Sequence, residues 1–197
     1  MEIEFKYRVP PELFDALAAD PALAGAAAIA MDANYYDTAD RRLRAASVTL
    51  RLRRETPLGT DGAMICCVKM PAPGGDGSDA ALRRRLEFEC EAESVEAALP
   101  ALIALGMPED ALRDALAQGL VVTARVAFIR LEALVCADGA SYTVCLDRGI
   151  LGKTPFSELE VEHKTGDFDI TAAAARGLAA KYGLEPEPRS KYMRAML

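Results

Sequence analysis

The sequence EIEFKYR, at residues 2–8, alternates charged and apolar side chains over its whole length. Successive side chains of an extended chain point to opposite sides, so this pattern predicts a β-strand with two unlike faces. Glu2, Glu4, Lys6 and Arg8 share one face, and the opposite face is apolar. The strand can therefore pack on one side while the other side meets water or a polar cavity.

The same alternation recurs in strand-like segments along the chain. Strands are predicted at residues 2–8, 34–38, 47–55, 63–70, 85–91, 120–131, 132–136, 141–148 and 158–163. Helices are predicted at residues 10–18, 95–105 and 108–118, and from Asp169 or Thr171 to Lys181. Closely spaced strands of alternating polarity are typical of an antiparallel barrel. We therefore expect an α+β fold in a single domain, residues 1–197, with helices packed outside a β-barrel.

One face of these strands is charged, and two interpretations compete. Antiparallel sheets often expose a polar face to water. Here, however, the charged face consists almost solely of Glu, Lys and Arg, and Glu158, Glu160 and Glu162 would repel one another without a cation between them. Carboxylates suit Mg²⁺ or Mn²⁺, whereas Arg and Lys suit phosphate oxygens. The pattern favours a charged barrel interior that binds a metal-chelated polyphosphate.

Composition excludes several other classes of protein. The net charge of −7 argues against a general nucleic-acid binder. The five cysteines lack metal-ligand spacing, which indicates reduced thiols in the cytoplasm. The N-terminus lacks the pattern of a signal peptide, and the alanine-rich segment 16–30 is too interrupted to span a membrane. A single histidine, His163, excludes a multi-histidine zinc site, and the segment GGDG at 74–77 lacks the lysine of a P-loop.

The segment EIEFK at residues 2–6 resembles the N-terminal ExExK signature of the CYTH proteins, also called triphosphate tunnel metalloenzymes. Further segments resemble that family in the same order along the chain. They are YYDT at 35–38, LRLR at 50–53, VK at 68–69, RLEFE at 85–89, TAR at 123–125, LD at 146–147, ELEVE at 158–162 and SK at 190–191. The resemblance covers essentially the whole chain.

The resemblance implies an eight-stranded antiparallel tunnel with a charged interior and helices outside. It implies that Mg²⁺ or Mn²⁺ is held by Glu2, Glu4, Glu158, Glu160 and Glu162. It assigns phosphate binding to Lys6, Arg8, Arg51, Arg53, Lys69, Arg85, Arg125 and Lys191. Glu4, Lys6, Glu160 and Glu162 would be the catalytic residues, supported by Glu87, Glu89 and Asp147.

Activities in the family include inorganic triphosphatase, thiamine triphosphatase, mRNA-capping triphosphatase and class IV adenylate cyclase. Inorganic triphosphate requires only the charged tunnel, so we expect hydrolysis of its terminal phosphoanhydride. The chain has no tryptophan to receive a thiamine ring, and no adenine pocket can be identified. We expect a small-molecule triphosphate as partner, no nucleic acid or membrane, and a monomer or homodimer. The alternatives are a cyclase, a thiamine triphosphatase, a non-catalytic polyphosphate or nucleotide binder, and a structural protein that keeps only the shape of the tunnel.

Overall fold

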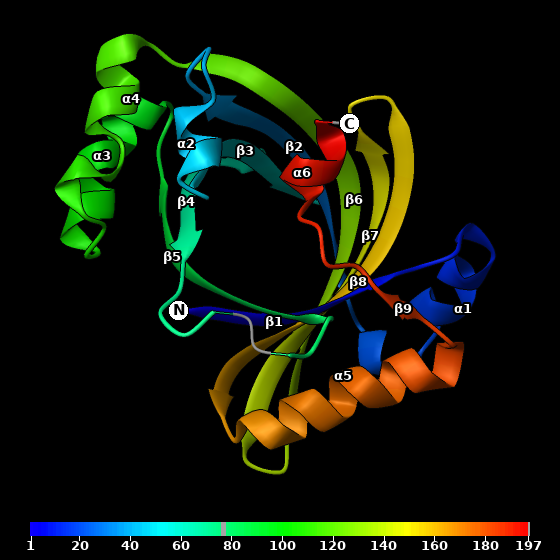
Figure 1. Cartoon of the computed structure of the whole chain (residues 1–197). Helices are drawn as coiled ribbons and strands as arrows, with labels where there is room; N and C mark the ends of the chain where they lie inside the picture. The colour runs from blue at the N-terminus through cyan, green and yellow to red at the C-terminus, as the bar shows by residue number, and fades with distance from the viewer. Residues whose placement is uncertain (76–77, 197) are drawn as a thin grey trace.

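A closed barrel of eight antiparallel strands dominates the structure, a computed structural model that describes residues 1–75 and 78–196 (Figure 1). Around the barrel the strands are β1 (Glu2–Arg8), β5 (Leu82–Glu91), β4 (Ala63–Pro71), β3 (Thr49–Pro57), β2 (Ala27–Asp37), β6 (Val121–Ala137), β7 (Ala140–Leu151) and β8 (Thr154–Gly166). β8 then pairs with β1 and closes the ring, and the short β9 (Glu185–Pro186) adds to β1. The predicted eight-stranded barrel is confirmed.

The charged face of β1 points into this barrel. Glu2 lies opposite Arg85 on β5, whereas Glu4 and Lys6 lie opposite Glu162 and Glu160 on β8. Both neighbours thus bring charged side chains to the same face, because paired residues of antiparallel strands project to the same side. The N-terminal alternation therefore sets the polarity of the interior.

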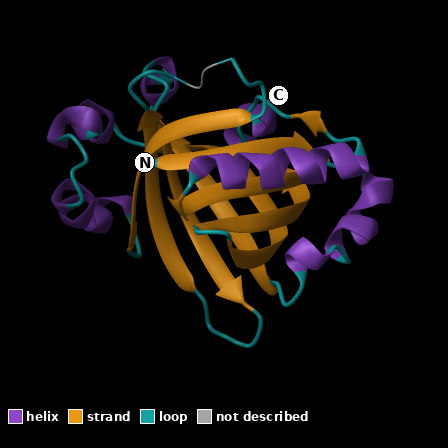
Figure 2. Ribbon diagram, turned by 90° about the horizontal axis from the view of Figure 1, so that it is seen from below, coloured by secondary structure: helices purple, strands orange, loops and turns teal. Residues whose placement is uncertain are grey.

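Helices cover the outer, apolar faces of the strands (Figure 2). These are α1 Phe14–Ala18, α2 Arg42–Ala45, α3 Val95–Ala104, α4 Arg113–Gln118 and α5 Phe168–Tyr182, with 3₁₀ turns η1 Pro11–Leu13, η2 Pro21–Leu23 and η3 Glu109–Ala111. The last helix, α6 Lys191–Ala195, packs instead against the interior side of the wall. α5 packs Ala172 and Ala175 against Phe5 and Val161 of the barrel wall. α3 packs Leu102 in the same way near Leu50. None of the helices in the described part of the chain is long and apolar enough to cross a membrane.

One side of the barrel interior is apolar, which the sequence interpretation did not expect. Met31 and Tyr35 of β2 and Val126 and Phe128 of β6 form a cluster with Tyr192 of α6. The rings of Tyr35 and Tyr192 stack at a centroid distance of 5.1 Å. The C-terminal segment therefore folds back onto the interior wall, and the remaining space faces the charged strands.

Several predicted element bounds need correction. β6 is one strand of 17 residues, not two strands that meet at residues 131 and 132. β2 begins inside the alanine-rich segment, and β9 and α6 occupy a tail for which no element was predicted. The GGDG segment at 74–77 includes residues 76 and 77, which lie outside the described residues, as does Leu197 at the end of the predicted domain.

Replacing Gly149 with Ala is expected to destabilise the barrel by about 1–3 kcal/mol, because an added methyl group overpacks the wall. A Cβ atom at this position of β7 would lie 2.1 Å from the carbonyl oxygen of Ala127 and 2.4 Å from Cβ of Phe128. Urea unfolding measures the loss. Gly177→Ala in α5 is the control, since among the described atoms a Cβ there meets nothing within 4 Å; equal losses in the two variants would contradict the expectation.

Asp20 links the start of η2 to α5 and should make stability depend on pH. Its buried carboxylate accepts hydrogen bonds from Lys181, Tyr182 and the amide of Ala22. Burial opposes ionisation, but these three bonds outweigh it and lower the pKa of Asp20. The stabilisation is therefore present above the pKa of an unfolded Asp, about 3.9, and is lost as the pH falls through the lower folded value.

Asp20→Asn is accordingly expected to cost about 1–3 kcal/mol at pH 7, the usual penalty for disrupting a buried hydrogen-bonded charge. The difference from the wild-type protein should shrink on acidification to pH 3, because the carboxylate of the unfolded chain gains a proton before that of the folded protein. Urea midpoints at the two pH values measure both quantities. A difference that stays constant between pH 7 and pH 3 would refute the linkage.

Candidate triphosphate and metal site

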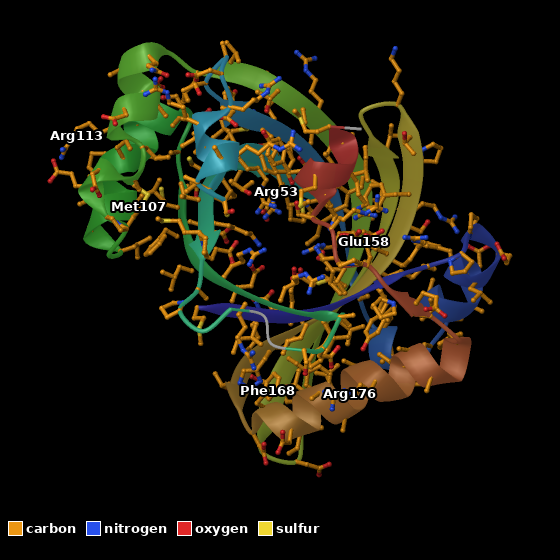
Figure 3. The ribbon with its side chains drawn as sticks, viewed as in Figure 1. Arg53, Met107, Arg113, Glu158, Phe168 and Arg176 are labelled. Carbon is orange, nitrogen blue, oxygen red and sulfur yellow. The ribbon has the colours of Figure 1, made fainter. Side chains whose placement is uncertain are left out.

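A cavity of about 480 Å³ lies inside the barrel. Basic side chains outnumber acidic ones on its described wall, although the whole chain is acidic. The basic residues are Lys6, Arg44, Arg51, Arg53, Lys69, Arg83, Arg85, Arg130, Lys164 and Lys191. The acidic residues are Glu2, Glu4, Glu55, Glu87, Glu89, Glu132, Glu160 and Glu162. Figure 3 shows Arg53 directed into the barrel, whereas Met107 and Arg113 lie outside it with α3 and α4.

Three carboxylates meet at one end of this cavity. Glu2 of β1, Glu87 of β5 and Glu162 of β8 each place an oxygen within 4.8 Å of the other two. They also line, with Glu89, a second hollow of about 230 Å³ beside Met1. Oxygen donors gathered in this way fit a hard divalent cation such as Mg²⁺ or Mn²⁺. This group, called the carboxylate triad below, contains two of the predicted metal ligands and Glu87, which was predicted in a supporting role.

Opposing effects set the ionisation of the triad. Burial disfavours the charged form of Glu87, but Lys69 and Arg51 outweigh it and lower its pKa to about 2. Burial raises the pKa of Glu162, and its ion pair with Lys164 at 2.8 Å only partly compensates. The triad therefore brings together carboxylates with different proton affinities, and a bound cation would favour the ionised form of each.

A second acidic cluster is neutralised within the barrel wall. Asp147, Glu158 and Glu160 approach one another as the triad does. Lys191 pairs with all three, Arg130 binds Asp147 through two hydrogen bonds of 2.8 Å, and Arg194 binds Glu158. Asp147 and Glu158 are completely buried. Burial opposes the charge of Asp147 and Glu160, but these basic partners prevail and lower both pKa values.

The predicted metal ligands thus divide between the two clusters. Glu2 and Glu162 belong to the triad, whereas Glu158 belongs to the neutralised cluster together with Asp147. Glu160 borders the cavity but pairs with Lys191, Arg130 and Lys6. Glu4 lies between the clusters, with Lys6 at 3.3 Å, and burial raises its pKa.

Two arginines are positioned for an anion. Arg51 and Arg53 project from β3, and neither Nε atom has a hydrogen-bond partner among the described residues. Arg51 reaches Glu89 only at 3.9 Å, whereas Arg53 donates a hydrogen bond to Glu55 through its Nη2 atom. Buried guanidinium donors that remain unused are costly, so they are available to phosphate oxygens. Lys6, Lys69, Arg85 and Lys191, also predicted to bind phosphate, line the same cavity.

Two predicted phosphate ligands lie elsewhere. Arg8 stands at the end of β1, largely exposed, and pairs with Glu187 at 3.1 Å. Arg125 is exposed on the outer face of β6, because Ala124, Val126 and Phe128 take the inward positions. The pairing of β2 with β6 shifts between Tyr35 and Tyr36, at the start of the TAR segment, and is regular from Ala124 onward. Neither Arg8 nor Arg125 lines the cavity, so the prediction that both project into it is wrong.

Sequence analysis missed several residues of the cavity wall. They are Arg44, Glu55, Arg83, Arg130, Glu132 and Lys164. Arg130 and Glu132 continue the inward face of β6, on which Phe128 also lies; they were missed because Arg125, on the opposite face of the same strand, was placed in the cavity instead. Arg44 belongs to α2, whose first turn is anchored by hydrogen bonds from the amides of Leu43 and Arg44 to Asp37.

Comparison with known proteins agrees with this architecture. The family model described as CYTH domain matches residues 1–196. No curated protein matches the chain significantly.

Solved structures of similar fold come from several organisms. A candidate adenylyl cyclase from Hippeastrum, described as revealing a dominant triphosphatase activity, has a TM-score of 0.70 and 18% identity over 100% of this chain and 97% of its own. A candidate adenylate cyclase from Bacillus halodurans has a TM-score of 0.64 and 20% identity, over 98% and 96%. The PH1819 protein from Pyrococcus horikoshii has a TM-score of 0.58 and 19% identity, over 96% and 95%. At such identities the likeness concerns the fold.

Proposed function

Because this chain belongs to the CYTH family, we propose that it is a divalent-metal-dependent triphosphatase that cleaves the terminal phosphoanhydride of inorganic triphosphate. One observation carries the proposal: the carboxylate triad and the arginines of β3 face the same cavity inside the barrel. A tunnel with only basic residues would suffice to hold a polyanion. Carboxylates that can bind a metal ion, placed beside arginines that can bind an anion, favour an enzyme over a simple binder.

The basic wall accounts for substrate binding and alignment. Triphosphate carries several negative charges near neutral pH, which repel a nucleophile from its terminal phosphorus. Arg51 and Arg53 would neutralise that charge and fix the chain of phosphates in one orientation. Lys6, held between Glu4 and Glu160 at 3.3 and 2.9 Å, would donate to another phosphate oxygen. Orientation and charge neutralisation are the main tasks of a protein in phosphoryl transfer.

Glu2, Glu87 and Glu162 would hold the divalent cation. When bound, such an ion polarises phosphate oxygens and lowers the pKa of a bound water. The surrounding protein limits the access of bulk water, since Glu2 and Glu4 are buried and α6 packs on the interior. The neutralised cluster around Lys191 would keep that side of the wall rigid.

An organic triphosphate is the second candidate. Ile29, Met31 and Phe128 line the cavity on the side opposite the charged strands, and Met193 of α6 joins them. Apolar side chains of this kind can receive a base or another ring. ATP turnover, including cyclisation, is therefore the alternative to which this side of the cavity points.

Kinetics with three substrates test the proposal. Tripolyphosphate, ATP and thiamine triphosphate are compared with Mg²⁺, with Mn²⁺ and with a chelator, and the products are identified. We expect a higher kcat/KM for tripolyphosphate than for either organic substrate, with phosphate and pyrophosphate as products. Cyclic AMP and pyrophosphate from ATP would instead establish the cyclase. The five cysteines are free thiols, which supports the cytoplasm as the site of this activity.

A further inference from the structure

Lys69 occupies the space between two ligands of the carboxylate triad. Its Nζ lies 2.5 Å from Oε1 of Glu2 and 3.2 Å from Oε1 of Glu87. Three neighbouring strands fix this arrangement, because β4 pairs Lys69 with Glu87 on β5, and β5 pairs with β1 next to Glu2. The ammonium group of Lys69 thus already occupies the position in which a divalent ion would bind.

The other lysines near the triad are placed differently. Lys6 pairs with Glu4 and Glu160, neither of which is in the triad. Lys164 pairs with Glu162 alone and is more exposed than Lys69. Only Lys69, among the lysines of the described residues, bridges two triad members.

The side chain of Lys69 also has an alternative position, in the main cavity. It lines the main cavity on the same side as Arg51, with Thr49 directly across the strand pair. A lysine side chain has a flexible stem of four carbons and an ammonium that donates in several directions. A polyphosphate in the cavity would offer it anionic partners that replace Glu2 and Glu87.

We propose that Lys69 is a resident counterion of the carboxylate triad, which metal displaces only when an anion draws the lysine toward the cavity. Metal and triphosphate then bind cooperatively, and the anion-free protein binds metal weakly. The inference rests on the proposed function for the identity of the metal and of the anion. It predicts an unusual direction of effect: removal of a cavity lysine should strengthen metal binding.

The test measures Mn²⁺ binding by the anion-free protein, without turnover. Electron paramagnetic resonance of free Mn²⁺ gives the Kd for the wild-type protein and for Lys69→Met, with Lys69→Gln as a second variant in case the first does not fold. We expect at least about tenfold tighter binding when Lys69 is removed, since a unit charge at this distance costs several kcal/mol at the effective dielectric of a protein. Lys153→Met, in the exposed β7–β8 turn, controls for net charge.

The outcomes separate this inference from the proposed function. A gain in Mn²⁺ affinity in the Lys69 variants, absent from Lys153→Met and abolished by an added Glu87→Gln, supports the inference. Unchanged or weaker Mn²⁺ binding in both Lys69 variants overturns it, even if the wild-type protein cleaves tripolyphosphate. Absence of tripolyphosphate cleavage, measured separately, would overturn the proposed activity whatever the Mn²⁺ titration gives.

Discussion

Arg130→Met is expected to destabilise the protein by about 3–5 kcal/mol, the usual effect of removing one partner of a buried ion pair. Arg130 is the main partner of Asp147, whose side chain is completely buried, and it also contacts Glu160 at 2.5 Å. Without the guanidinium, Asp147 would keep Lys191 as its basic partner, and it would share that lysine with Glu158 and Glu160. The protein would then retain an uncompensated buried charge.

Urea unfolding at neutral pH measures this loss. Arg125→Met is a matched control, because Arg125 lies on the same strand with the same side chain but is exposed on the outer face. That variant should be as stable as the wild-type protein. Equal stabilities of the Arg125 and Arg130 variants would contradict the assignment of the inward face of β6.

Glu2→Gln is expected to lower metal-dependent triphosphatase turnover by at least about 100-fold, because loss of even an outer-shell partner of a metal can cost 10–100-fold. The amide keeps the shape of the side chain but removes the charge of one of the three converging oxygen donors. The loss should shrink at high Mn²⁺ concentration if weakened metal binding is its cause. Steady-state kinetics over a range of Mn²⁺ concentrations distinguish the two effects.

Glu12→Gln serves as the control for this variant. Glu12 is an exposed glutamate in η1, outside the barrel, so the same change there should leave turnover at the wild-type rate. Wild-type turnover by Glu2→Gln at every metal concentration would contradict the metal-binding role of the triad.

The barrel could be predicted because alternation is a local property. Each residue from Glu2 to Arg8 alternates in face with its neighbours, so the two faces of β1 can be read from the sequence. The register with β8 was not predicted, since it places Glu4 opposite the like-charged Glu162. The end of the chain could not be predicted in this way. α6 has only five residues, and it is held by tertiary contacts of Lys191, Tyr192 and Arg194 with distant strands.

The candidate site was predicted in outline, and its errors have a common physical origin. Periodicity assigns a residue to a face but does not show which partner neutralises it. Alternation places Glu158 and Glu162 on the same face, and both were predicted to bind metal. In the structure Glu158 is enclosed by Lys191 and Arg194, whereas Glu162 lines the cavity. Arg125 was assigned to phosphate by the resemblance of its TAR segment, whereas alternation with Phe128 and Arg130 places it on the outer face of β6.

Phosphate release from tripolyphosphate by the wild-type protein is the most direct test of the proposal that this barrel is a metal-dependent triphosphatase. The rate is measured with Mg²⁺ or Mn²⁺, and again after addition of excess EDTA. We predict rapid release of phosphate and pyrophosphate with metal and almost complete loss with EDTA. Tight binding of tripolyphosphate without cleavage in the presence of either Mg²⁺ or Mn²⁺ would contradict the account and leave the barrel as a polyphosphate-binding module.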